Sequence, residues 1–95
     1  MMYRSKYEPL QVFLLNSSSN AGDLTLTFRK LEEIIGASLP KSAFQYREWW
    51  SNQSDVSNRP QAKAWISAGY EVDAVRLDSI DGWVRFRQIV QVTDK

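Results

Sequence analysis

A turn signal near the end of the chain constrains the fold most strongly. Asp81-Gly82 separates two stretches, Tyr70 to Leu77 and Trp83 to Val92, in which apolar and polar residues alternate. A period of two indicates β-strands, and Asp-Gly between two strands favours a tight turn. The apolar phase changes between Ala74 and Val75, which indicates a β-bulge or exposure on one side. The sequence therefore predicts a β-hairpin, and with it an antiparallel sheet.

The returning strand of this hairpin has two unlike faces. We expect one face to be apolar, with Val84, Phe86, Val90 and Val92. The opposite face should carry Trp83, Arg85 and Arg87, because side chains alternate across a strand. The first face is expected to join the hydrophobic core.

The rest of the chain is mainly helical in pattern. Helices are expected over Tyr7 to Leu15, Phe28 to Ile35, Lys41 to Trp50 and from Pro60 to Gly69, with a short strand at Leu24 to Phe28. Thr27 should cap the second helix and Gly36 should end it. Ser42 and Gln45 have the spacing of a capping box for the third helix. Its inner stripe is expected to be Ala43, Tyr46 and Trp50.

These elements predict an α+β fold in the order α-β-α-α-α-β-β. Its length suits a single domain over residues 1–95, with an ordered core at about residues 6–90. The expected core comprises Phe28, Leu31, Ile35, Trp50, Trp65, Val84 and Phe86.

The residue types exclude much of enzyme chemistry. The chain has no cysteine and no histidine, so thiolate and imidazole metal sites, disulfides and His-dependent triads are excluded. We expect a protein that is not an enzyme and uses no cofactor or metal. No apolar stretch is long enough to span a membrane, and no signal-peptide core follows the N-terminus. We therefore expect a cytoplasmic protein with no membrane partner.

The order of elements is similar to that of a winged helix-turn-helix. In that layout the third helix reads nucleic acid and the hairpin is the wing. The leading hypothesis is therefore non-catalytic DNA binding, in a regulatory or defence role. The contact residues would be Lys41, Gln45, Arg47 and Asn52 on one line, and Arg85 with Arg87 on the other. A fourth helix before the hairpin, Glu48 on the reader helix and several hairpin acids depart from this layout.

Other interpretations of these residues remain open. Arg85 and Arg87 could form ion pairs across the hairpin with Glu71 or Asp73. Asn52 could instead cap the end of the helix. The alternative function is a small protein-binding module or inhibitor, from a phage or mobile element, with exposed Trp49 or Trp83 as its anchor. Salt separates the two functions, because phosphate contacts weaken steeply as salt rises.

A scattered set of residues resembles an uncharacterised family of small bacterial domains. Its pattern, Trp-Trp-x-Asn … Ala-Trp … Gly, is present here as Trp49-Trp50-Ser51-Asn52, Ala64-Trp65 and Gly69. The resemblance covers about Lys6 to Gln88. It implies one domain in which these residues act together, either as packing or as a site. It implies no activity, and a short copy would suit a bacterial or phage accessory protein.

Overall fold

The computed structural model describes residues 5–17, 22–52, 59–78 and 80–89. Its elements follow the predicted order, with a short 3-10 helix added after the third α-helix. They are α1 (Glu8–Ser17), β1 (Asp23–Thr27), α2 (Phe28–Ile35), α3 (Lys41–Gln45), η2 (Arg47–Trp50), α4 (Pro60–Ser67), β2 (Tyr70–Arg76) and β3 (Trp83–Gln88). The α+β class is therefore confirmed. None of the described helices is both long and apolar enough to cross a membrane.

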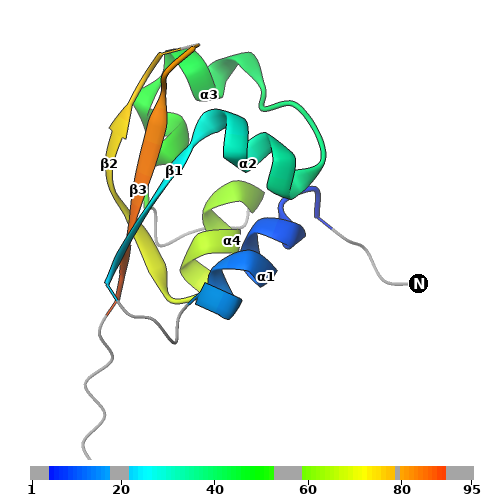
Figure 1. The fold of residues 1–95 in the computed structure, drawn as a ribbon, viewed down its shortest axis with the longest axis vertical. Helices are drawn as coiled ribbons and strands as arrows, with labels where there is room; N and C mark the ends of the chain where they lie inside the picture. The colour runs from blue at the N-terminus through cyan, green and yellow to red at the C-terminus, as the bar shows by residue number, and fades with distance from the viewer. Residues whose placement is uncertain (1–4, 18–21, 53–58, 79, 90–95) are drawn as a thin grey trace, which may run out of the picture.

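The three strands form one antiparallel sheet in the order β1-β3-β2 (Figure 1). The last strand in the chain, β3, is therefore the central one, and Phe86 pairs with Leu24 on one side and Val72 on the other. The register of β2 shifts between Val72 and Ala74, so the predicted bulge is confirmed. Val90 and Val92, which were expected to extend the last strand, lie outside the described residues.

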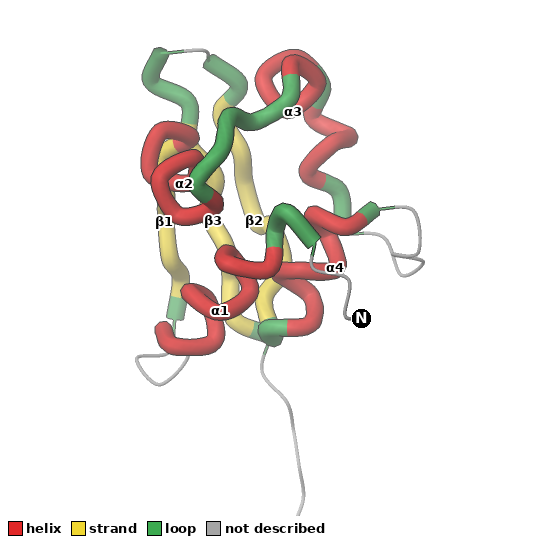
Figure 2. Tube along the Cα trace, turned by 90° about the vertical axis from the view of Figure 1, so that its right-hand side faces the viewer, coloured by secondary structure: helices red, strands yellow, loops and turns green. Residues whose placement is uncertain are grey.

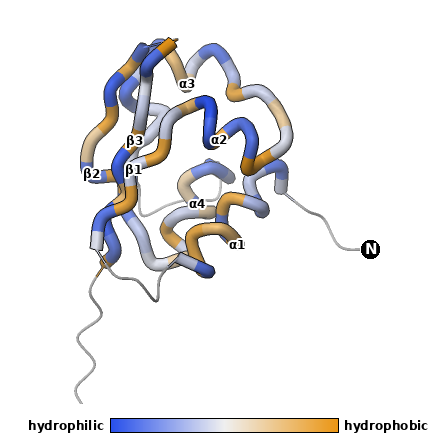
Figure 3. The backbone as a smooth tube through the Cα atoms, viewed as in Figure 1, coloured by the Kyte–Doolittle hydropathy of each residue, from blue (hydrophilic) through white to orange (hydrophobic). Residues whose placement is uncertain are grey.

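The helices lie on one face of the sheet and leave the other face open. Figure 1 shows α1, α2 and α4 on the same side of the strands, and Figure 2 shows the strands behind them. Hydrophobic and hydrophilic residues alternate along β2 and β3 (Figure 3), as a sheet with one buried face requires. All seven residues expected in the core are buried together: Phe28, Leu31, Ile35, Trp50, Trp65, Val84 and Phe86.

Helix α2 begins and ends where the sequence predicts. The Thr27 side chain accepts a hydrogen bond from the Lys30 backbone N–H at 3.0 Å. Gly36 follows with φ of 70°, a left-handed conformation in which a Cβ would be strained. The helix is therefore fixed at both ends, and its start lies directly after β1.

The prediction of one helix from Lys41 to Trp50 is wrong. Tyr46 has an extended backbone, with φ of −125° and ψ of 121°, and it separates α3 from η2. The break turns the chain so that Trp50 enters the core, where its Nε1–H donates to the Ala43 carbonyl at 2.9 Å. Tyr46 consequently points out of the core and is 56% exposed.

The predicted capping box at the start of this helix is also wrong. Pro40 is the N-cap residue, and no side chain bonds to the first turn of α3. Because the helix already begins at Lys41, Ser42 lies inside it rather than at the capping position.

Candidate functional site

The open face of the sheet carries the arginines that the sequence singled out. Arg85 and Arg87 alternate with the buried Val84 and Phe86 along β3, and Trp83 lies half-buried on the same face as the arginines. The prediction that Trp83, Arg85 and Arg87 share one face of the last strand is therefore confirmed.

Both arginines are held by acids of β2. Arg85 Nη2 lies 2.7 Å from Asp73 Oδ2, and its Nε donates to the same oxygen at 2.9 Å. Arg87 Nη2 lies 2.5 Å from Glu71 Oε2, and its Nη1 lies 3.7 Å from Asp73 Oδ1. The hydrogen bonds that Arg87 donates to Glu71 and the charge of Asp73 raise the pKa of Arg87 above its ordinary value. The ion-pair interpretation is confirmed, and the two arginines are neutralised by two carboxylates.

The segment around η2 covers the free edge of β2. Arg47 Nη1 donates to the Val75 carbonyl at 3.0 Å. Asn52 Nδ2 donates to the Val72 carbonyl at 2.8 Å, and Asn52 Oδ1 accepts from the Val72 N–H at 2.7 Å. The amide of Asn52 thus pairs with Val72 as a neighbouring strand would, just where the bulge begins.

Asn52 also joins this edge to the core. Its Oδ1 accepts a third hydrogen bond, from Trp65 Nε1 at 2.9 Å. The interpretation in which Asn52 caps a helix is wrong, because Ser51 is the C-cap residue of η2 and the bonds of Asn52 go to Val72 and Trp65. These bonds occupy both amide atoms, which leaves less of the side chain for a ligand. The one hint of this role in the sequence was the position of Asn52 in the Trp-Trp-x-Asn pattern.

The tryptophans of the pattern form a stack that is mostly inside the protein. The Trp50 ring stacks on Phe28, with centroids 5.2 Å apart, and on Trp65 at 5.9 Å. Trp49 makes edge-to-face contacts with Trp50 and Tyr7, with ring centroids 4.6 Å and 5.9 Å apart respectively. Trp49 is half-buried. The packing interpretation of Trp49 is therefore the one that the structure supports.

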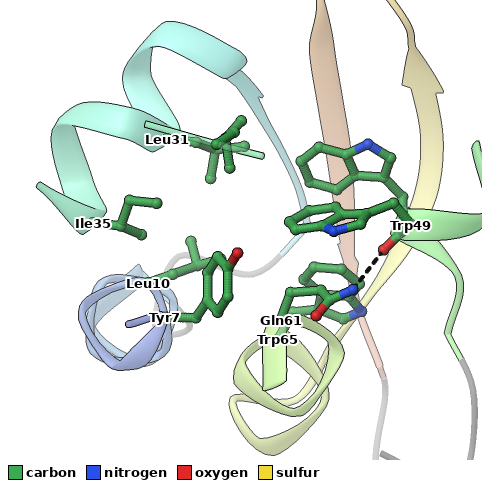
Figure 4. Close-up of a pocket in the computed structure, with 9 residues that line it drawn as sticks. Tyr7, Leu10, Leu31, Ile35, Trp49, Gln61 and Trp65 are labelled. Carbon is green, nitrogen blue, oxygen red and sulfur yellow. Dashed lines mark hydrogen bonds between the residues drawn. The ribbon is translucent and has the colours of Figure 1, made fainter. Parts of the chain in front are cut away.

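A small pocket lies among α1, α2, α4 and η2 (Figure 4). Tyr7, Leu10, Leu31 and Ile35 line one side, and Trp49, Gln61 and Trp65 line the other. Gln61 Nε2 donates to the Trp49 carbonyl at 3.2 Å, and burial raises the pKa of Tyr7. The lining has no charged side chain and the space is about that of one water molecule, so it is a gap in the core.

A different set of exposed cations lies on or next to the elements at one end of the molecule. We call this the hairpin end: the start of α2, helix α3 and the β2–β3 turn, which lie together at the top of Figure 1. Phe28 joins the three parts, because its N–H donates to the Gly82 carbonyl at 3.0 Å and its ring meets Phe44 of α3 at 5.4 Å. Phe28 therefore joins the start of α2 to α3 and to the described part of the turn.

Three exposed cations at or next to the hairpin end form no hydrogen bond or ion pair with the described residues, although the charge of Arg76 acts on Asp78. Arg29, Lys41 and Arg76 make no hydrogen bond or ion pair within the described part of the chain, unlike Arg85 and Arg87. Gln45 is exposed on the same short helix as Lys41. Of the predicted contact residues, the structure thus places Lys41 and Gln45 on one short helix, with Arg47 just after it. Asn52, Arg85 and Arg87 are hydrogen-bonded to other parts of the protein. Arg29 and Arg76 were missed because their freedom from partners depends on tertiary structure.

The turn itself is organised by an acid. Asp78 Oδ1 accepts from the Ile80 N–H at 2.8 Å and the Asp81 N–H at 3.1 Å, which lowers the pKa of Asp78. The Gly82 N–H also donates to the Asp78 carbonyl, at 3.0 Å. The hairpin connection is therefore longer than a two-residue Asp81-Gly82 turn.

These features define the class of the protein: a small α+β domain with a tryptophan-rich core and an open, ion-paired sheet face. The chain belongs to the family described as "Domain of unknown function (DUF7662)", whose model matches residues 7–88. The resemblance to an uncharacterised small domain family is thus confirmed. No curated protein and no solved structure matches the chain. Among the described residues, no group of three or more Asp and Glu side chains could hold a metal ion.

Proposed function

We propose that this domain binds nucleic acid without catalysis, through the hairpin end. The observation that carries the proposal is that exposed cations with no hydrogen bond or ion pair to the described residues lie on or next to three segments that Phe28 joins. A cation that forms no ion pair can neutralise a phosphate without first breaking one. Arg29 and Lys41 meet this condition among the described residues, and Arg76 forms no ion pair there although its charge acts on Asp78.

The proposal changes the contact set expected from the sequence. Lys41 and Gln45 are retained, with α2 and α3 in the place of a helix-turn-helix and the hairpin as the wing. Arg85 and Arg87 become secondary, because a phosphate would have to compete with Asp73 and Glu71 for them. Helix α3 has only five residues, so we expect few base contacts and mainly backbone contacts.

The direct test is a fluorescence-anisotropy titration against mixed duplex and single-stranded DNA at several salt concentrations. Lys41→Ala and Arg76→Ala should each weaken binding to all sequences and reduce the salt slope by about one. Lys63→Ala is the matched control, because Lys63 is also exposed and without a partner in the described residues but lies on α4. Arg87→Ala should change the slope less than Lys41→Ala does.

Two outcomes would overturn the proposal. Absence of binding at tens of micromolar protein in low salt is one, because non-specific affinities fall in the range of about 1–100 µM at physiological salt. The other is an equal loss of affinity in Lys63→Ala and Lys41→Ala. It would show that binding depends on the overall charge of the protein and not on a site at the hairpin end.

A protein partner is the second candidate, and one observation favours it. Ile80 is 76% exposed and Tyr46 is 56% exposed, both in or beside the hairpin end. Exposed aromatic and aliphatic side chains serve as anchors at protein interfaces. In that case the complex should survive high salt, and loss of Tyr46 or Ile80 should weaken it more than loss of Lys41.

A further inference from the structure

Trp83 differs from the other three tryptophans of the chain. Those three lie in the hydrophobic core or pack against it, whereas Trp83 is half-buried on the open face of the sheet and does neither. Its ring has no aromatic neighbour among the described residues, and its indole N–H makes no hydrogen bond with them, unlike those of Trp50 and Trp65. The fold therefore leaves the indole of Trp83 available to a ligand.

The register of the sheet places Trp83 in a row with one cation and one small side chain. Trp83 of β3 pairs with Arg76 of β2 on one side and with Thr27 of β1 on the other. Directly opposed residues lie side by side on one face, with Cβ atoms about 4.5–5.5 Å apart. The next row along the open face consists of Thr25, Arg85 and Ala74. Apart from the arginines, the side chains beside the indole are therefore small, so a planar group can approach it from the open face.

The three rows of the open face differ in charge. The row farthest from the hairpin end has one cation between two acids, and it consists of Asp23, Arg87 and Glu71. In the middle row, the cation Arg85 is held by Asp73 of the bulge. The row of Trp83 has the cation Arg76 and no acid. The face therefore becomes more positive toward the hairpin end, which favours an anionic group beside Trp83.

Arg76 is the cation of this face that a ligand can reach without breaking an ion pair. It is exposed and forms no hydrogen bond or ion pair with the described residues, whereas Arg85 and Arg87 do. The charge of Arg76 acts on Asp78, whose carboxylate already accepts hydrogen bonds from two backbone N–H groups. Asp81, which is exposed in the turn before β3, is the charge that opposes an anion here.

A half-exposed indole beside a cation without an ion pair matches the chemistry of a nucleotide in a single strand. Proteins that bind single strands stack bases on aromatic side chains and neutralise the phosphates with neighbouring cations. In one class of RNA-binding domain, the aromatic side chains that stack the bases lie on an open sheet face. A duplex cannot make this contact, because its bases are already paired and stacked on one another.

We infer that a base of single-stranded nucleic acid stacks on Trp83 and that Arg76 neutralises a neighbouring phosphate. The inference rests on the proposed function, because Arg76 is one of its cations, and narrows it from nucleic acid in general to single strands. It also extends the site from the hairpin end onto the first row of the open sheet face. Because every base has a flat ring, the stack carries little sequence preference.

The test uses the full chain and a dye-labelled single strand of DNA of about eight nucleotides, followed by fluorescence anisotropy. A second strand of the same length is abasic at every position, so it keeps the phosphates and lacks the bases. The unaltered protein should bind the abasic strand about 5- to 150-fold more weakly, which is the range expected for the loss of one stacked base.

Variants then locate the contact. Trp83→Ala should weaken binding to the ordinary strand by a similar factor, without changing the affinity for the abasic strand or the salt slope. Trp83→Phe keeps an aromatic ring and should retain most of the affinity. Arg76→Ala should weaken binding to both strands and reduce the salt slope by about 0.7. Tyr46→Ala is the matched control, because Tyr46 is also an exposed aromatic residue but lies between α3 and η2. Asp81→Asn should tighten binding to both strands at low salt, because it removes the opposing charge.

The outcomes separate this inference from the proposed function. Equal affinity of the unaltered protein for the ordinary and the abasic strand overturns the stack, leaves the proposed function standing and requires no variant to fold. Binding to duplex DNA alone does the same. The stack on Trp83 is also overturned if Trp83→Ala loses affinity equally for both strands, or if Tyr46→Ala loses as much as Trp83→Ala. Failure to bind duplex or single-stranded DNA overturns both proposals.

Discussion

Replacing Asn52 by alanine should destabilise the fold far more than its exposed position suggests. The change leaves the Trp65 indole N–H without its acceptor, and Trp65 is fully buried at 0% exposure. An unsatisfied buried donor costs about 1–3 kcal/mol. The two bonds to Val72 lie on a strand edge that water can reach, so their loss costs about 0.5–1.5 kcal/mol together.

The expected total is therefore about 1.5–4.5 kcal/mol, a large share of the roughly 5–15 kcal/mol typical of a small domain. Urea unfolding followed by tryptophan fluorescence measures this quantity, and the midpoint should fall with little change in slope. For a domain of this size, the melting temperature should drop by about 4–8 °C for each kcal/mol.

A double-mutant cycle with Trp65→Phe isolates the key hydrogen bond. Phenylalanine has no N–H, so Asn52→Ala should cost at least about 1 kcal/mol less in that background. A cost for Asn52→Ala of under about 0.5 kcal/mol, the range of ordinary surface substitutions, would refute the reasoning. So would equal costs in the two backgrounds, because the bond to Trp65 would then contribute nothing.

Four further predictions concern stability. Trp65→Ala should cost about 3–5 kcal/mol by leaving a cavity in the core, measured by urea unfolding. Ser51→Ala should be neutral or raise the melting temperature, because the buried Ser51 Oγ has no hydrogen-bond partner among the described residues. Gly82→Ala should cost about 1–3 kcal/mol, because its Cβ would collide with Phe28, and calorimetry would detect the loss. The pKa of Asp78 is lowered in the folded state, so its stabilising effect is complete above the ordinary Asp pKa of about 3.9. That effect should disappear as the pH falls through the lower folded value, and Asp78→Asn should flatten this acid limb of a melting-temperature profile.

Local signals in the sequence were sufficient for most of the fold. Alternation over β2 and β3, the Thr27 cap and Gly36 are each properties of a few neighbouring residues, and they gave the element types and order correctly. The break at Tyr46 could not be found in this way. It exists because Trp50 must reach a gap between Phe28 and Trp65, which are distant in sequence.

The candidate site was predicted less well for a similar reason. The types of residue on the open face were clear from alternation, but whether Arg85 and Arg87 are available depends on the acids that the β2–β3 register sets opposite them. Whether Arg76 forms an ion pair could be judged only once the acids described around it had been placed. Residue type indicates what a side chain can do, and tertiary pairing decides whether it is free to do it.

The central place of β3 has a consequence for how the chain folds during synthesis. Neither β1 nor β2 has a neighbouring strand until β3 leaves the ribosome, because both pair only with it among the described strands. The contacts of β1 with β3 span most of the sequence, and such long-range contacts form slowly. A nascent chain that ends before Trp83 therefore exposes two strand edges and an uncovered apolar face. We expect such fragments to aggregate, and the tryptophan core to close only after β3 has joined the sheet.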